Sequence, residues 1–317
     1  MKSINPSNIA HFDIDRSFAS YFREKNYPFS LNYKNLSKIK NAKKLTIITI
    51  KSNSKIEKKV LNKLPSLKAI ITRTIGTNHL DLPACKKHNV SVWHIPDYGA
   101  FAIAEHVFAL ILSHTRKIIP LREETKKGKF SWINGQGFTL KDKTIGIIGV
   151  GKTGKETAKI ARGFQMKVLG FDKLKDEDFA KKYSLKYASL TYLLKSSDII
   201  SINMPLVRQT FHLIGSDQIK LMKQNSILVN VSRGEIIDTK TLVKNLAKFR
   251  YVCLDVIEGE NHYNLKNPLI RKLVNSEKVC ITPHIAFFTD LTTQEIARIT
   301  KKNIENFLNR SHRNQVL

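Results

Sequence analysis

The sequence predicts an α/β protein built from two doubly wound parallel-sheet domains. Its 317 residues are enough for two domains of ordinary size, each with its own core. Short apolar runs alternate with amphipathic stretches from one end of the chain to the other, which is the pattern of parallel β–α–β layers. Near the middle of the chain, one apolar run leads through a Gly-rich turn into a helix-like stretch, an arrangement typical of doubly wound sheets.

The first part of the chain predicts a small doubly wound domain. Helix-like segments over residues 55–64, which Pro65 ends, and 81–88 separate apolar runs. The strands predicted here are residues 9–14, 45–50, 69–72 and 90–94.

The rest of the chain predicts a second, larger alternation. A long helix over residues 102–117 and a polar loop dotted with glycines precede it, and a helix over about residues 291–309 ends the chain. The strands predicted here are residues 144–150, 167–172, 198–203, 226–230, 251–255 and 278–281.

Composition excludes several classes of protein. Apolar residues make up 42% of the chain and aromatic residues 9%, which favours a packed globular protein over extended disorder. The first fifteen residues are too polar for a secretory signal. The most apolar stretch, residues 101–111, is short and interrupted by Glu105 and His106, so it predicts a buried helix. We expect a soluble cytoplasmic protein with no membrane partner.

The formal net charge of +28 raises the question of a nucleic-acid partner. The lysines are scattered and greatly outnumber the arginines, which indicates a compositional bias rather than a shaped phosphate-binding stripe. We therefore expect no dedicated nucleic-acid partner, although a basic surface speeds the arrival of anionic ligands.

The three cysteines, Cys85, Cys253 and Cys280, show neither CxxC pairing nor metal-ligand spacing. They predict buried thiols in a reducing compartment and no metal site.

The Gly-rich turn predicts a dinucleotide site because it lies between a strand and a helix. It reads Gly149-Val150-Gly151-Lys152-Thr153-Gly154. Gly149 permits the tight turn, Gly151 lets the backbone approach a pyrophosphate, and Gly154 lets the helix pack closely on the strand. The helix N-terminus presents amide groups and a partial positive charge to the phosphates. A structural turn without a ligand is the alternative.

Asp172 ends the next predicted strand, eighteen residues beyond Gly154. A carboxylate there accepts hydrogen bonds from the ribose hydroxyls and repels the 2′-phosphate of NADP. The predicted cofactor is therefore NAD, while the neighbouring Lys173 leaves some tolerance of NADP open.

Three polar residues follow successive predicted strands, at the strand ends where open α/β sheets bind ligands: Arg233, Glu260 and His284. An arginine clamps a substrate carboxylate with two hydrogen bonds, and a histidine exchanges a proton near neutral pH. A carboxylate beside the histidine favours its protonated form and fixes its tautomer. Taken singly, each residue has another interpretation: a capping or salt-bridging arginine, a solvated loop acid and a satisfied loop histidine.

These residues lie in motifs that span nearly the whole chain, and the chain resembles the D-isomer-specific 2-hydroxyacid dehydrogenases, especially their D-lactate dehydrogenase branch. Besides the Gly-rich turn, the motifs are TRTIGTNHLD (72–81), PDYG (96–99), AEH (104–106), MPL (204–206), NVSRG (230–234) running on to Asp238, LDVIEGE (254–260) and TPHIAFFT (282–289).

The resemblance implies catalytic roles. Arg233 binds the substrate carboxylate, His284 is the acid/base, and Glu260 is its partner. Glu258 competes for the partner role, but the family's catalytic glutamate aligns with Glu260. Substrate contacts are implied for the backbone amides of Ile75 and Gly76 and for the side chains of Tyr98 and Phe287; cofactor contacts are implied for Lys152, Thr153, Met204, Pro205, Val231 and Asp255.

The resemblance also implies the domain organisation. A Rossmann cofactor domain (residues 99–285) is inserted into a flavodoxin-like substrate domain (1–98, completed by 286–317), with the active site in the cleft. Homodimers through the cofactor domain are usual in the family. Glu105 and His106 are interpreted as interdomain packing residues.

Two departures from the family pattern remove no catalytic group: Val207 and Arg208 in the cofactor loop, and Asn261 after Glu260. The sequence therefore predicts an NAD-dependent D-2-hydroxyacid dehydrogenase that interconverts D-lactate and pyruvate. Glyoxylate, hydroxypyruvate or a bulkier 2-keto acid are alternative substrates, since a pocket distinguishes neighbouring side chains by only about 1–3 kcal/mol per methylene. An NAD-sensing binding protein resembling the transcriptional corepressors of this family is the alternative from another class.

Overall fold

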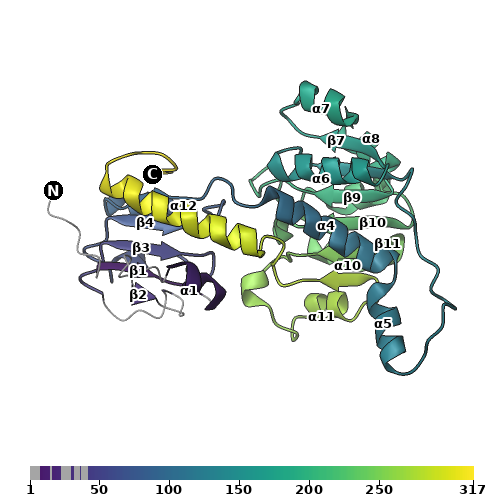
Figure 1. Ribbon diagram of the computed structural model, residues 1–317, viewed down its shortest axis with the longest axis horizontal. Helices are drawn as coiled ribbons and strands as arrows, with labels where there is room; N and C mark the ends of the chain where they lie inside the picture. The colour runs from purple at the N-terminus through teal and green to yellow at the C-terminus, as the bar shows by residue number, and fades with distance from the viewer. Residues whose placement is uncertain (1–7, 15, 23–29, 32–35, 37–41) are drawn as a thin grey trace. The chain divides into compact units, whose positions relative to one another are not determined.

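The computed structural model describes residues 8–14, 16–22, 30–31, 36 and 42–317. Residues 1–7, on which the expectation of no secretory signal partly rests, lie outside the described residues. The chain divides into two compact units, one comprising Met1–Gly99 with Phe288–Leu317 and the other Ala100–Phe287. Each contains one parallel sheet (Figure 1), which confirms the predicted α/β class.

The sheet of the first unit has the strand order β2-β1-β3-β4-β5, and every neighbouring pair is parallel. This is the flavodoxin-like order. Four of its strands follow the predicted apolar runs, whereas the short β2 was not predicted. The strands are β1 (Ile9–His11), β2 (Ser30–Leu31), β3 (Ile47–Ile50), β4 (Ala69–Thr72) and β5 (Ser91–Trp93).

Helices cover both faces of this sheet: α1 (Arg16–Phe22), α2 (Lys58–Leu61), α3 (Leu82–Lys87) and α12 (Asp290–Leu308). Helix α12 packs on one face through Ile304 and Phe307, and the ring of Phe307 meets the edge of Trp93 at 5.4 Å between centroids. Buried side chains of α2 and α3 pack on the opposite face. The predicted helix over 55–64 is shorter than expected because Ile56 forms a β-bridge with Leu80.

The sheet of the second unit has seven parallel strands in the order β12-β11-β10-β9-β6-β7-β8. Counted from β6, this is the Rossmann order 3-2-1-4-5-6 with one further strand. The three-residue β8 was not predicted. The strands are β6 (Thr144–Ile148), β7 (Lys167–Phe171), β8 (Leu185–Tyr187), β9 (Ile199–Ile202), β10 (Ser226–Asn230), β11 (Phe249–Leu254) and β12 (Val279–Ile281).

Two layers of helices enclose this sheet: α4 (Ala100–Thr115), α6 (Lys152–Gly163), α7 (Glu177–Tyr183), α8 (Leu190–Ser196), α9 (Ser216–Leu221), α10 (Thr239–Lys244) and α11 (Pro268–Val274). A further helix, α5 (Ile118–Lys126), follows α4 and has no buried residue. One core lies under α4 and α6, and a second lies under α8 to α11. The predicted helix 102–117 ends early because Lys117 has a φ of 52°, and α5 begins after it. Among the described residues, none of the helices has the length and apolar character needed to cross a membrane.

Candidate active site

The Gly-rich turn after β6 is closed by direct backbone packing. Gly149 has a φ of 94°, in the left-handed region, and a Cβ atom there would lie 2.7 Å from the carbonyl oxygen of Asn203. A Cβ atom at Gly154 would lie 2.0 Å from the carbonyl oxygen of Gly149. A larger side chain at Gly149 would therefore clash with the backbone after β9, and one at Gly154 would push the turn off α6.

Gly151 differs from these two glycines, because a Cβ atom there would meet nothing within 4 Å. Packing within the protein does not explain a glycine at this position, whereas close approach of a phosphate does. Gly151 is also the N-cap of the twelve-residue helix α6, and its backbone cap carries no side-chain hydrogen bond. The first turn of α6, which includes Lys152 and Thr153, therefore suits a pyrophosphate.

Asp172 directly follows β7 and is held in a fixed orientation. Its Oδ2 accepts a hydrogen bond from the Val150 amide at 2.7 Å, and its Oδ1 accepts one from the Leu174 amide at 3.1 Å. The carboxylate is thus tied to the Gly-rich turn itself, and the side chain stays partly exposed. A ribose bound at the turn would meet this carboxylate.

The other predicted cofactor residues follow the neighbouring strands. Met204 and Pro205 come just after β9, and Met204 Cβ would lie 2.9 Å from a Cβ atom at Gly149. Val231 follows β10 and is 8% exposed. These residues therefore border the Gly-rich turn at the carboxyl ends of adjacent strands.

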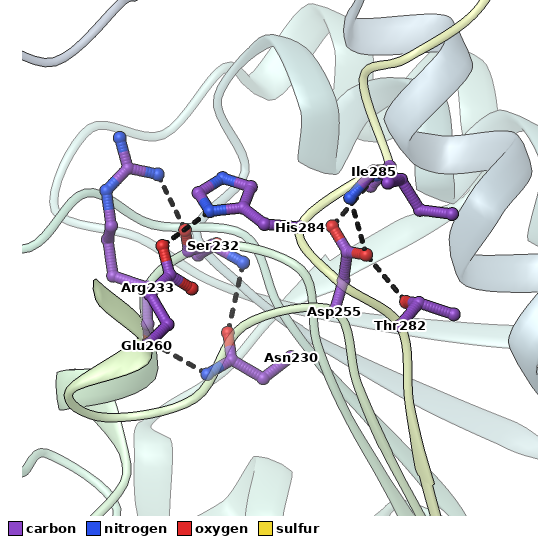
Figure 2. Close-up of polar contacts among 9 residues, drawn as sticks. Asn230, Ser232, Arg233, Asp255, Glu260, Thr282, His284 and Ile285 are labelled. Carbon is purple, nitrogen blue, oxygen red and sulfur yellow. Dashed lines mark hydrogen bonds and ion pairs between the residues drawn. The ribbon is translucent and has the colours of Figure 1, made fainter. Parts of the chain in front are cut away.

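Arg233 lies in a turn that the Asn230 side chain stabilises by hydrogen bonds. Asn230, the last residue of β10, donates from Nδ2 to the Arg233 carbonyl oxygen at 2.8 Å and accepts from the Ser232 amide at 3.0 Å. Arg233 Nη1 donates to the Ser232 carbonyl oxygen at 2.7 Å, as Figure 2 shows. The guanidinium keeps its other N–H donors for a ligand, and it is partly exposed.

The turn that carries Arg233 contacts the loop that carries Glu260. A Cβ atom at Gly234 would lie 2.0 Å from the Ile257 carbonyl carbon and 2.2 Å from the Glu258 amide nitrogen. Only glycine allows the two backbones this close approach. The loops after β10 and β11 are therefore fixed against each other.

Glu260 and His284 form a close pair. His284 Nδ1 lies 2.6 Å from Glu260 Oε1, and the side chains are 34% and 32% exposed, respectively. Figure 2 shows the imidazole and the carboxylate pointing toward each other. Strands β10, β11 and β12 are parallel neighbours in the sheet, so the residues that follow them meet at one edge.

Asp255 organises the loop on which His284 lies. Its carboxylate accepts hydrogen bonds from Thr282 Oγ1 at 2.6 Å and from the amides of Ile285 and Ala286 at 2.9 Å. Burial would raise the pKa of Asp255, but its hydrogen bonds, including one from His106, outweigh burial and lower that pKa. The Asp255 side chain has no exposed surface. Its contact with the nicotinamide carboxamide stays a prediction.

His106 belongs to the same network, which the sequence did not reveal. Its Nε2 lies 3.1 Å from Thr282 Oγ1 and 3.5 Å from Asp255 Oδ1. The sequence analysis interpreted His106 as an interdomain packing residue, whereas its partners Thr282 and Asp255 belong to the same unit as His106. Its partners are more than one hundred residues away in sequence, and no local pattern identifies them.

The remaining predicted residues are substrate contacts that follow β4, β5 and β12. Ile75 and Gly76 follow β4, and Thr74 Oγ1 donates to the Gly76 carbonyl oxygen at 2.6 Å. Ile75 is 43% exposed, and Tyr98 is partly buried. The Phe287 ring lies 6.4 Å from the His284 ring, centroid to centroid. No group of three or more metal-ligating side chains occurs among the residues that the structure describes.

A dinucleotide-type turn and a His–Glu pair at one edge of a Rossmann sheet are the parts of a nucleotide-linked oxidoreductase. Residues 108–286 match the family model described as "D-isomer specific 2-hydroxyacid dehydrogenase, NAD binding domain". The chain belongs to this family of oxidoreductases, which act on keto and hydroxy acids with a nucleotide cofactor.

Individual relatives agree with this assignment. Glyoxylate reductase of Thermococcus litoralis is 33% identical over 269 residues, covering 82% of this chain and 78% of that protein. D-specific alpha-keto acid dehydrogenase of Enterococcus faecium is 32% identical over 272 residues, 82% of either chain. The crystal structure of D-lactate dehydrogenase from Aquifex aeolicus, complexed with NAD and lactic acid, superposes with a TM-score of 0.88 at 33% identity, covering 97% of this chain and 98% of that one.

Proposed function

We propose that this protein catalyses the reversible, NAD-linked interconversion of pyruvate and D-lactate. The observation that carries the proposal is the 2.6 Å contact between His284 Nδ1 and Glu260 Oε1. An imidazole held by a carboxylate, at the same sheet edge as Arg233 and the Gly-rich turn, is suited to moving a proton while a hydride moves at carbon. In this proposal residues 1–98 and 286–317 form the substrate domain, and residues 99–285 form the cofactor domain.

The partners of His284 determine which of its nitrogens reacts. An ionised carboxylate only accepts hydrogen bonds, so Nδ1 carries a proton that it donates to Glu260. Nε2 is then the atom that gives a proton to the C2 oxygen of a keto acid and takes it back from a hydroxy acid. Glu260 stabilises the charged imidazolium and keeps the ring oriented.

Arg233 binds the substrate carboxylate in this proposal. Its guanidinium is permanently charged and planar, and it makes paired hydrogen bonds to a carboxylate. The Asn230 side chain fixes the backbone beneath it. The amides of Ile75 and Gly76 and the side chains of Tyr98 and Phe287 complete the substrate contacts.

The cofactor is NAD rather than NADP, because Asp172 presents a fixed carboxylate beside the Gly-rich turn. When bound, the nicotinamide supplies or accepts the hydride. The test is Asp172→Asn, which keeps an oxygen acceptor for the Val150 amide and removes the charge. We expect the ratio of kcat/KM with NADH to that with NADPH to fall at least about tenfold. The control is Asp178→Asn on α7, which should keep the native ratio. An Asp172→Asn variant with the same ratio as this control would contradict the assignment.

Two substrates have support from relatives. The D-lactate dehydrogenase of Aquifex aeolicus superposes over nearly the whole chain, and Tyr98, Phe287 and the Glu258-Gly259-Glu260 run resemble the lactate branch. Glyoxylate is the second candidate, because the relative from Thermococcus litoralis is a glyoxylate reductase. The two acids differ by one methyl group, which a pocket separates by about 1–3 kcal/mol.

A panel of 2-keto acids tests the function. NADH oxidation is followed with pyruvate, glyoxylate, hydroxypyruvate and 2-ketoisocaproate, and kcat/KM is compared. We expect the highest value for pyruvate. A higher value for glyoxylate would transfer the assignment to the second candidate, and no turnover with any keto acid would refute the dehydrogenase proposal.

We also propose a homodimer formed through the segment that follows α4. Ile118 and Ile119 on α5 are each 53% exposed, and in the following loop Phe130 is 95%, Trp132 88% and Ile133 64% exposed. Exposed apolar side chains gathered in one segment mark an association surface, and a second copy offers the same surface across a two-fold axis. Sedimentation velocity should give a dimer for the native chain and a monomer for Phe130→Ser/Trp132→Ser. The control, Tyr192→Ser on α8, should remain dimeric; a monomeric native chain would contradict the proposal.

A further inference from the structure

We infer that His212 and Glu258 are a positioning pair that holds the Arg233 turn and the Glu260 loop in one geometry. This inference rests on the proposed function, because it assigns the pair a task that is exerted through Glu260. It concerns a second histidine–glutamate pair, distinct from His284 and Glu260.

The side chains of the pair are in direct contact. His212 Nε2 lies 2.9 Å from Glu258 Oε1, and the other carboxylate oxygen accepts a hydrogen bond from the Thr239 amide at 3.3 Å. The two side chains are 34% and 32% exposed, close to the exposures of His284 and Glu260. The Phe211 ring stacks on His212 at 4.0 Å between centroids, which restricts rotation of the imidazole.

The backbone around His212 binds the segment that leaves Arg233. The His212 amide donates to the Glu235 carbonyl oxygen at 2.8 Å, and the Ile214 amide donates to the Ile236 carbonyl oxygen at 3.0 Å. The Asp238 amide returns a bond to the Ile214 carbonyl oxygen at 3.1 Å. His212 is therefore bonded through its backbone to one catalytic loop and through its side chain to the other.

Glu258 and Glu260 lie on either side of Gly259, which has a φ of 73°. Each carboxylate contacts a different imidazole: Glu258 contacts His212, and Glu260 contacts His284. The backbone at Ile257 and Glu258 is also pressed against Gly234. A displacement of Glu258 therefore also displaces Glu260, which lies two residues further along the chain and is the partner of His284.

The pair borders a cavity of about 470 Å³, whose charged and titratable lining groups are His212, Asp238, Lys240 and Glu258. Asp238 caps α10 and accepts hydrogen bonds from the Thr241 amide and hydroxyl, which leaves Glu258 as the direct partner of the imidazole. These Thr241 contacts, led by the hydroxyl, lower the pKa of Asp238. The nearby His212 contributes to this lowering to a smaller extent. Because solvent reaches the pair, its hydrogen bond can be altered without unfolding a core.

The test compares His212→Gln with the native chain by two readouts. Glutamine keeps a hydrogen-bond donor but not the ring geometry or charge. We expect kcat/KM for pyruvate to fall about tenfold, because small displacements of a catalytic group are costly, while the Kd for NADH stays within about twofold. In imidazole ¹⁵N NMR, with the His284 signal assigned from His284→Gln, its titration midpoint should move down by about half a pH unit or more as Glu260 loses its fixed position.

A double-mutant cycle separates positioning from general destabilisation. If His212 acts through Glu260, His212→Gln should cost little further activity in a Glu260→Gln background. The control, Lys240→Gln, removes a charge from the same cavity and should leave activity and the His284 titration at native values. An unchanged His284 titration in His212→Gln, or additive losses in the cycle, would overturn the inference. The titration needs no substrate, so it tests the pair even if the 2-keto acid panel fails; panel failure alone counts against the proposed function.

Discussion

The side chains of Arg233, Glu260 and His284 owe their proposed roles to different physical properties. Arg233 keeps its positive charge at every relevant pH and presents a planar set of donors. A carboxylate only accepts hydrogen bonds, so the 2.6 Å contact with Glu260 fixes the tautomer of His284. Each role requires that particular residue type, and conservative replacements separate charge from geometry.

Arg233→Gln should lower kcat/KM for pyruvate by about 10² to 10⁴, because two charge-assisted hydrogen bonds of about 1.5–3 kcal/mol each are lost. Arg233→Lys should recover only part of the loss, since a lysine keeps the charge without the paired donors. Steady-state kinetics at saturating NADH measures both variants, with Arg271→Gln on α11 as the control. Native kinetics for Arg233→Gln would remove this residue from the site.

At the scale of elements, the apolar runs were sufficient to predict most strands of both sheets. Two short strands, β2 and β8, were missed because neither lies in a longer apolar run, whereas the equally short β1, β5 and β12 do. The predicted helix ended at Lys117, close to the end of α4, but α5 was missed because the chain after Lys117 was interpreted as a polar loop.

The candidate site also has a part that the sequence predicted and a part that it did not. Glycine spacing and strand ends were enough to predict the Gly-rich turn, Asp172 and the three polar residues. The pairing of His212 with Glu258 and that of His106 with Asp255 link distant segments. Such pairings depend on how loops meet at the sheet edge, which the local pattern of a sequence does not encode.

Asp255 makes the loop after β12 sensitive to acid. The pKa of its carboxyl in the folded protein lies below the ordinary value of 3.8, so its stabilising contribution is complete above that value and is lost as the pH falls through the folded pKa. Asp255→Asn should therefore lower the free energy of unfolding by about 2–4 kcal/mol at neutral pH, and the difference should narrow below about pH 4. Urea unfolding of both proteins from about pH 3 to pH 7 measures this. A difference that stays constant over the whole range would show that the carboxylate charge is not responsible.

At the scale of the whole molecule, the net charge of +28 acts on every anion that approaches. Both the keto acid and the dinucleotide are anions, and exposed charges are screened over about 10 Å at 0.1 M salt and about 3 Å at 1 M. A long-range attraction of this kind raises capture of substrate without altering the chemical step.

The KM for pyruvate should rise roughly threefold to tenfold between about 0.05 M and 0.5 M KCl, while kcat stays nearly constant. Initial rates over a salt series give both parameters. A KM independent of salt would mean that the positive surface does not assist substrate capture, and an equal fall in kcat would indicate an effect on folding or chemistry instead.

In the proposed function, the imidazole of His284 transfers the proton at the C2 oxygen of the substrate. The most direct test is kcat/KM for NADH-dependent pyruvate reduction by His284→Ala, with circular dichroism to verify that the variant is folded. We expect a loss of about 10² to 10⁴-fold with NADH binding retained. A folded variant that reduces pyruvate at the native rate would contradict it.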